Sequence, residues 1–84
     1  MTKPTRVSNT IAAFRARAGE MTQGELAARI GVTRQTVNAI ELGKYSPSLE
    51  VAFRISRVFD VGLEDVFEYP GARPTGHSGS GAGS

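Results

Sequence analysis

Five side chains between residues 34 and 39 are of the types that contact the edges of DNA bases: Arg34, Gln35, Thr36, Asn38 and Ala39. Glutamine and asparagine bond adenine through paired hydrogen bonds, arginine bonds guanine, and alanine or threonine methyl groups meet the methyl of thymine. Solvated helix faces more often carry Glu and Lys than amides and hydroxyls, although an ordinary surface helix is the alternative. We therefore regard this segment as a candidate base-reading surface.

Catalytic and metal chemistry are not expected. The sequence has no cysteine, and its single histidine, His77, has no second histidine or acid beside it. The carboxylates of Asp60, Glu64, Asp65 and Glu68 form an acidic cluster, but paired catalytic carboxylates need a cleft that perturbs them. We expect this cluster to be solvated and to favour the positive end of a short helix. We therefore predict that the chain is not an enzyme and binds no metal or cofactor.

Charge is divided unevenly along the chain, whose net charge is +2. Residues 1–44 carry seven basic and three acidic side chains, whereas residues 45–84 carry three basic and five acidic ones. The basic half is a candidate surface for phosphate contacts. The alternative is that the two kinds of charge solvate different helices.

The 84 residues suffice for one small domain. From Pro70 onward the sequence is rich in Gly, Ser and Pro and has no large apolar residue, so we expect a disordered tail over 70–84. Residues 1–7 are expected to be a flexible arm and 8–69 the folded domain. No apolar run could span a bilayer and no signal peptide is expected, which favours a cytoplasmic protein without a membrane partner.

Apolar residues recur at intervals of three and four across the domain, which predicts an all-α, compact five-helix bundle without strands. The expected helices cover residues 9–18, 23–30, 34–42, 49–59 and 63–67. Thr22 and Glu25 have the spacing of a capping box, and Thr33 and Ser48 are expected N-caps. The first helix is expected to bury Ile11, Phe14 and Ala18.

The second and third helices have the pattern of a helix-turn-helix. Ala27 is small where the two helices would cross, and Gly31 can adopt the left-handed conformation of the turn. Val37 and Ile40 point inward at 100° per residue. The residues expected to face outward, with Arg34 on their flank, are Gln35, Asn38, Ala39 and Leu42. The residues expected to fix the crossing are Leu26, Ile30, Val32, Val37 and Ile40.

Three runs in this region resemble the Xre/Cro/CI-type helix-turn-helix family over about 9–69: Thr22-Gln23-x-Glu25-Leu26-Ala27, Gly31-Val32-Thr33-Arg34-Gln35-Thr36-Val37 and Ile40-Glu41-x-Gly43-Lys44-Tyr45-x-Pro47-Ser48-Leu49. The resemblance implies a lambda-repressor-like DNA-binding domain. It implies phosphate contacts from Gln23, Thr33, Gly43, Lys44 and Tyr45. The last three residues form the loop after the third helix, which would act through backbone N–H groups and a basic side chain. Base contacts are implied for residues 34–36, 38 and 39.

The resemblance also implies a partly buried ion pair between Arg15 and Glu41, with separate surface charges as the alternative. Two positions depart from the family pattern. Gly24 lies in the first turn of a helix, where it costs up to about 1 kcal/mol relative to alanine. Leu42 stands where a polar or basic residue is common, so its partner is either a thymine methyl group or another apolar surface.

The helix expected over 49–59 has two apolar stripes, one formed by Leu49, Ala52, Phe53, Ser56 and Phe59 and the other by Val51, Ile55 and Val58. One stripe would pack on the first three helices; the other is either internal or in contact with a second subunit. Family members bind half-sites about 34 Å apart as two-fold dimers. We therefore expect a homodimer interface formed by Val58, Val61, Leu63, Val66 and Phe67.

These observations predict a sequence-specific DNA-binding regulator, and the family resemblance implies that it binds a pseudo-palindromic double-stranded operator as a dimer and acts as a repressor. The alternative is an antitoxin-like or other interaction module whose main partner is a second protein, with DNA autoregulation secondary.

Overall fold

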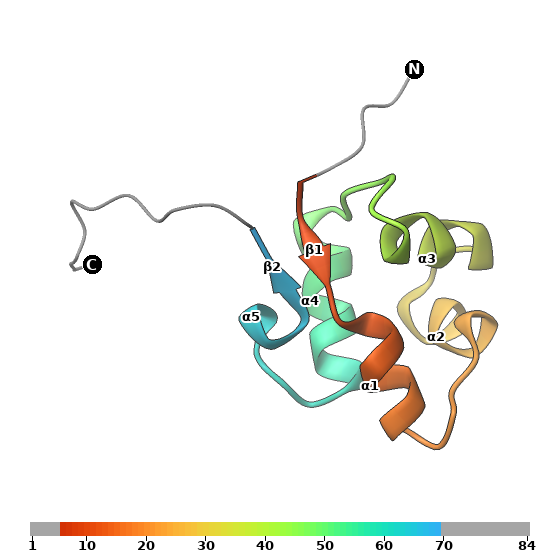
Figure 1. Cartoon of the computed structure of the whole chain (residues 1–84). Helices are drawn as coiled ribbons and strands as arrows, with labels where there is room; N and C mark the ends of the chain where they lie inside the picture. The colour runs from red at the N-terminus through yellow and green to blue at the C-terminus, as the bar shows by residue number, and fades with distance from the viewer. Residues whose placement is uncertain (1–5, 70–84) are drawn as a thin grey trace, which may run out of the picture.

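The computed structural model describes residues 6–69, which form five helices and two short strands (Figure 1). Residues 1–5 of the expected arm and the whole expected tail, 70–84, lie outside the described residues. The elements in chain order are β1 (Ser8–Asn9), α1 (Ile11–Arg17), α2 (Gln23–Ile30), α3 (Arg34–Glu41), α4 (Leu49–Val58), α5 (Leu63–Val66) and β2 (Phe67–Glu68). The all-α prediction is confirmed as a helical bundle with one small addition.

That addition is an antiparallel pair of two-residue strands, which joins the two ends of the domain (Figure 1). Ser8 lies opposite Glu68, and Asn9 lies opposite Phe67. The prediction of no strands was therefore wrong. Each strand is too short to show alternation, and its partner lies at the other end of the domain, so no local pattern marks it.

The strands also shorten two expected helices. Asn9 belongs to β1, so α1 begins at Ile11, and Phe67 belongs to β2, so α5 ends at Val66. The backbone N–H of Thr10 donates to the Val66 carbonyl at 2.9 Å and continues this junction. The start of α1 is thus set by residues from the far end of the chain.

Local cap chemistry fixes the starts of the next three helices. Thr22 accepts from the Glu25 N–H at 3.0 Å, and Glu25 accepts from the Thr22 N–H at 2.8 Å, which is the expected capping box. The Thr33 and Ser48 hydroxyls accept in the same manner at the starts of α3 and α4. Each cap satisfies a backbone N–H that the helix itself cannot bond.

The core is formed by apolar side chains from all five helices and the loop before α2: Ile11, Met21, Leu26, Ala27, Ile30, Val37, Ile40, Ile55 and Val66. Phe14 and Phe59 stack at its edge with ring centroids 5.5 Å apart. Ala18, expected in the core, is exposed because α1 ends at Arg17 and the chain turns away.

The apolar face of α4 is one broad face rather than two separate stripes. Its buried and half-buried positions combine members of both expected stripes, and they cover an arc of about 160° at 100° per residue. Leu49 and Phe53 lie outside this arc and are 67% and 47% exposed. None of the helices within residues 6–69 is long and apolar enough to cross a membrane.

Candidate nucleic-acid interface

The α2–α3 pair is held at a fixed angle by a tight turn. Gly31 ends α2 with φ of 77°, a left-handed conformation that strongly favours glycine. The N–H groups of Gly31 and Val32 both donate to the Ala27 carbonyl, at 2.9 and 3.0 Å. Ala27 is buried where the two helices meet, as its small size indicated. The turn and the crossing together fix the direction of α3.

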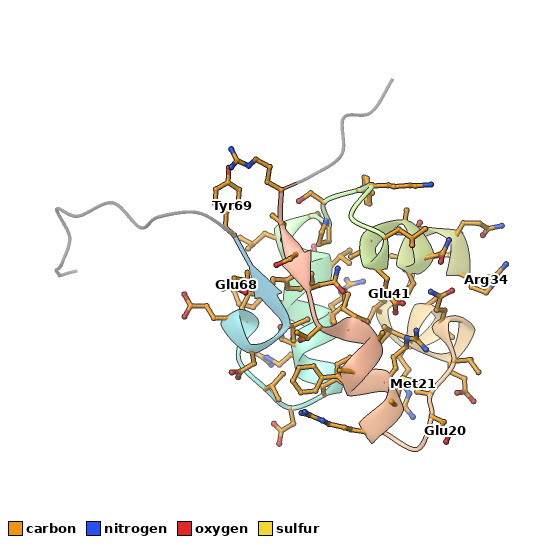
Figure 2. The ribbon with its side chains drawn as sticks, viewed as in Figure 1. Glu20, Met21, Arg34, Glu41, Glu68 and Tyr69 are labelled. Carbon is orange, nitrogen blue, oxygen red and sulfur yellow. The ribbon has the colours of Figure 1, made fainter. Side chains whose placement is uncertain are left out.

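The outward face of α3 carries the candidate base-reading side chains. Val37 and Ile40 are buried, so the opposite side of the helix faces solvent. Arg34, Gln35 and Asn38 are exposed there. Thr36 and Ala39 are half-buried. Figure 2 shows Arg34 at the outer edge of α3, away from the rest of the bundle.

Thr33 and Thr36 form a local pair at the start of α3. The Thr33 hydroxyl accepts from the Thr36 N–H at 3.2 Å and lies 3.0 Å from the Thr36 hydroxyl. Both hydroxyls therefore have protein partners in the free chain, so contact with DNA by either hydroxyl competes with this local pair.

Arg15 and Glu41 are joined by two hydrogen bonds across the bundle. Arg15 Nε donates to Glu41 Oε2 at 2.7 Å, and Nη2 donates to Oε1 at 2.9 Å. Arg15 Nη1 also donates to the Met21 carbonyl at 2.9 Å. The side chains are only 18% and 10% exposed. The expected ion pair is thus present and ties α1 to the end of α3.

This hydrogen bonding raises the pKa of Arg15 above its ordinary value, because Glu41 stabilises the charged guanidinium more than partial burial opposes it. The arginine is therefore a permanently charged anchor rather than a titrating group.

Gln23 connects this ion pair to the exposed face of α3. Its Nε2 donates to Glu41 Oε1 at 3.0 Å and to Asn38 Oδ1 at 3.2 Å. Both amide protons of the expected phosphate-binding residue therefore have partners within the protein. To donate to a phosphate, Gln23 must give up one of these bonds.

The loop after α3 is closed by its own backbone. The Gly43 N–H donates to the Ile40 carbonyl at 3.1 Å, and the Lys44 N–H donates to the Ala39 carbonyl at 2.9 Å. Gly43 has φ of 74°, as this helix-ending motif requires. Both N–H groups thus satisfy the last carbonyls of α3, so a contact from either of them to phosphate would compete with these bonds. The exposed side chains of Lys44 and Tyr45 are the groups that the loop offers.

Asn9 is a positioning residue that the sequence reasoning missed. Its Oδ1 accepts from the Ile11 N–H at 3.1 Å, and its Nδ2 donates to the Ile40 carbonyl at 3.0 Å. One side chain thus bonds the first N–H of α1 and the carbonyl of Ile40 near the end of α3. An Asn just before an apolar helix is a cap signal, but its bond to α3 depends on tertiary structure.

The residues expected at a dimer interface differ in exposure. Val66 is only 1% exposed within one chain, so it belongs to the monomer core and is unavailable to a second subunit. Val58, Val61 and Phe67 are half-buried and pack on that core. Leu63 is half-buried but is not part of this packing.

Two short helices, a glycine turn and an exposed polar face on the second helix define a helix-turn-helix protein. A family described as helix-turn-helix matches residues 11–66, which is most of the chain. The chain belongs to the Xre/Cro/CI-type helix-turn-helix family of transcriptional regulators.

Relatives are found in archaea and bacteria. An uncharacterized HTH-type transcriptional regulator of Methanocaldococcus jannaschii is 55% identical over 49 residues, covering 58% of this chain and 74% of that protein. One from Archaeoglobus fulgidus is 54% identical over 54 residues, covering 64% and 76%. The regulator YgzD of Bacillus subtilis is 48% identical over 61 residues, covering 73% and 91%.

Proposed function

We propose that this chain is a transcriptional regulator that binds double-stranded DNA with α3 in the major groove. The observation that carries the proposal is the exposed face of α3, on which Arg34, Gln35 and Asn38 project from a helix anchored by buried residues on its other side. Such a face can present hydrogen-bonding groups to base edges in the major groove. Because α3 is already fixed in the fold, binding need not order the helix. Ala39 and the Thr36 methyl group would meet thymine methyls.

Phosphate contacts would flank this face. Lys44 and Tyr45 supply an ammonium and a phenol from the loop after α3, and Thr33 lies at the N-terminus of α3. Gln23 is the first residue of α2, where the helix dipole favours an anion. These contacts would fix how deeply α3 enters the groove, while the bases select the sequence.

We also propose a two-fold homodimer on a pseudo-palindromic operator, since one short helix contacts too few bases for high specificity. Leu63 supports an interface around α5, because it is apolar, partly exposed and outside the core packing. Val58, Val61 and Phe67 would add the solvent-facing parts of their side chains. Repression by excluding polymerase from the operator, in the cytoplasm, completes the proposal.

The test begins with a selection of bound duplexes from a random pool. The enriched duplex and a shuffled copy are then compared by fluorescence anisotropy at several salt concentrations. We expect a preference of about 1,000-fold or more for the enriched duplex, two chains per site and an inverted repeat in the sequence. Equal, weak and steeply salt-dependent binding to both duplexes would contradict sequence-specific regulation.

A further inference from the structure

A hollow of about 650 Å³ lies between the end of α2 and the face of α4, and it shares no residue with the proposed DNA contacts. The described residues that line it are Ala28, Arg29, Ile30, Gly31, Glu50, Phe53, Arg54, Arg57 and Val58. Three arginines therefore surround it, against one carboxylate.

One of these arginines is a structural part of the wall. Arg54 Nη1 donates to the Ile30 carbonyl at 3.1 Å, and Nη2 donates to Glu50 at 2.7 Å. It thus closes the end of α2 and neutralises the carboxylate of the hollow. Arg29 and Arg57 are exposed, and neither guanidinium has an ion-pair or hydrogen-bond partner within residues 6–69. Two guanidinium groups are therefore available to anions.

The hollow also offers an apolar surface. Phe53 is 47% exposed, although it is a large aromatic side chain on a helix whose apolar residues are mostly buried or half-buried. Ala28 is exposed beside it, and Val58 is half-buried. An aromatic side chain flanked by arginines is the composition of an interaction hot spot.

We infer that this hollow binds an acidic segment of a partner protein, which inserts one large apolar side chain against Phe53 and pairs its carboxylates with Arg29 and Arg57. Arginine forks match carboxylates through paired hydrogen bonds, so the charge pattern favours an acidic peptide. The inference goes beyond DNA binding, because a partner held here would leave α3 free.

Other occupants fit the hollow less well. Most of its lining residues are exposed, so a small ligand would not be enclosed as small-molecule sites require. A DNA backbone would satisfy the arginines but leave Phe53 without an apolar partner. A second copy meeting this face about a two-fold axis would bring like-charged arginines together.

The test is a selection of randomised short peptides, displayed on phage, against the full chain. We expect enriched peptides to carry one large apolar residue flanked by acidic residues. A labelled synthetic copy is then titrated by anisotropy against the unaltered chain and two sets of variants. The R29E/R57E double variant and, separately, Phe53→Ala should each weaken binding by at least about tenfold.

The matched control is R6E/R17E, which makes the same change of net charge at exposed arginines outside the hollow. It should leave peptide affinity within about twofold. Circular dichroism checks that every variant keeps its helices. Absence of acidic, apolar-containing peptides among those selected, or equal binding by R29E/R57E and the control, overturns the inference.

Two further outcomes would assign the hollow to another occupant and also overturn it. If R29E/R57E weakens binding to a random duplex more than R6E/R17E does, the hollow contacts DNA. If R29E/R57E dissociates the proposed dimer while the control does not, the hollow is part of the interface between two copies, to which Val58 is already assigned. Because sequence-specific DNA binding is measured separately, failure of either proposal can be recognised alone.

Discussion

Gln23 in α2 donates a hydrogen bond to the side-chain oxygen of Asn38 in α3 at 3.2 Å. An expected phosphate-binding residue thus orients an expected base-reading residue. This bond uses one of the two lone pairs of the Asn38 oxygen and none of its amide protons. Asn38 would therefore donate to acceptors such as purine N7 or thymine O4.

This coupling predicts non-additive losses. Gln23→Ala and Asn38→Ala should each weaken binding to the selected operator by about 1–3 kcal/mol. The double variant should lose less than the sum, because removing Gln23 already frees Asn38 to adopt other orientations. Anisotropy titrations of the unaltered chain, the two single variants and the double variant provide this double-mutant cycle. Losses that add within error would show that the two residues act independently.

Gln35 and Lys44 should differ in what they recognise. Gln35→Ala is expected to cost about 1–3 kcal/mol on the selected operator and little on random DNA, because it removes a base contact. Lys44→Ala should weaken both complexes alike, because an ammonium on a phosphate reads no sequence. Titrations against both duplexes test this pair, each variant serving as the other's control. Equal losses for Gln35→Ala on the two duplexes would exclude it as a base reader.

Arg15→Ala should destabilise the fold rather than only weaken binding. It strands the partly buried carboxylate of Glu41 and leaves the Met21 carbonyl without its donor, at a cost of about 3–5 kcal/mol. Urea unfolding measures the loss. Arg17→Ala, on the same helix but exposed, should cost less than about 1 kcal/mol.

The pH dependence follows from the raised pKa of Arg15. A cation whose pKa is higher in the folded state stabilises the fold fully below its unfolded value, and this stabilisation is lost only as pH rises through the raised value. The difference between Arg15→Ala and the unaltered chain should therefore persist into mildly alkaline buffer. A difference that disappears on raising pH from neutral to mildly alkaline would contradict this assignment.

Two glycines in the α2 region should respond oppositely to alanine. Gly24→Ala should stabilise the chain by up to about 1 kcal/mol, since a methyl group there meets Thr22 and Arg34 only at ordinary distances of 3.8 and 4.0 Å. Gly31→Ala should destabilise it by about 1–2 kcal/mol, because φ is 77° and the methyl group would lie 3.3 Å from Arg54 Nη1. Thermal and urea unfolding compare the two. Changes of the same sign would refute the argument.

A charge at Leu63 should dissociate the proposed dimer. Leu63→Glu places a carboxylate in an apolar interface while leaving the monomer core intact, so sedimentation should show monomers and operator affinity should fall. Leu49→Glu is the matched control, since it makes the same change at an exposed apolar position on α4. If the control dissociates the dimer and Leu63→Glu does not, the interface lies at the start of α4 instead.

The sequence predicted best what short-range chemistry determines. The caps at Thr22, Thr33 and Ser48 were predictable because each acts on an N–H three residues away. The orientation of α3 was predictable from Val37 and Ile40, because only one rotation of the helix about its axis places both side chains in the core. The same was true of the glycine turn between α2 and α3.

Features that depend on distant partners were not predictable. Asn9 reads locally as a helix residue, yet it pairs in β1 and bonds the end of α3. The apolar residues of α4 were compatible with two packing faces. Only the folded structure shows that Leu49 and Phe53 are exposed rather than part of the core. Val66 was predicted at an interface because the sequence does not show that it packs into a core formed by residues distant along the chain.

The pairing of β1 with β2 has a consequence for how the protein is made. Ser8 and Glu68 must meet, and Thr10 must reach Val66, a core residue, before the first helix has its native start. Closing so long a loop carries an entropic cost that only the completed core repays. On the ribosome, residues 8–65 can form helices but cannot complete the fold until residues 66–68 emerge. The domain should therefore fold in one late cooperative step, and its DNA-reading helix would be fully anchored only then.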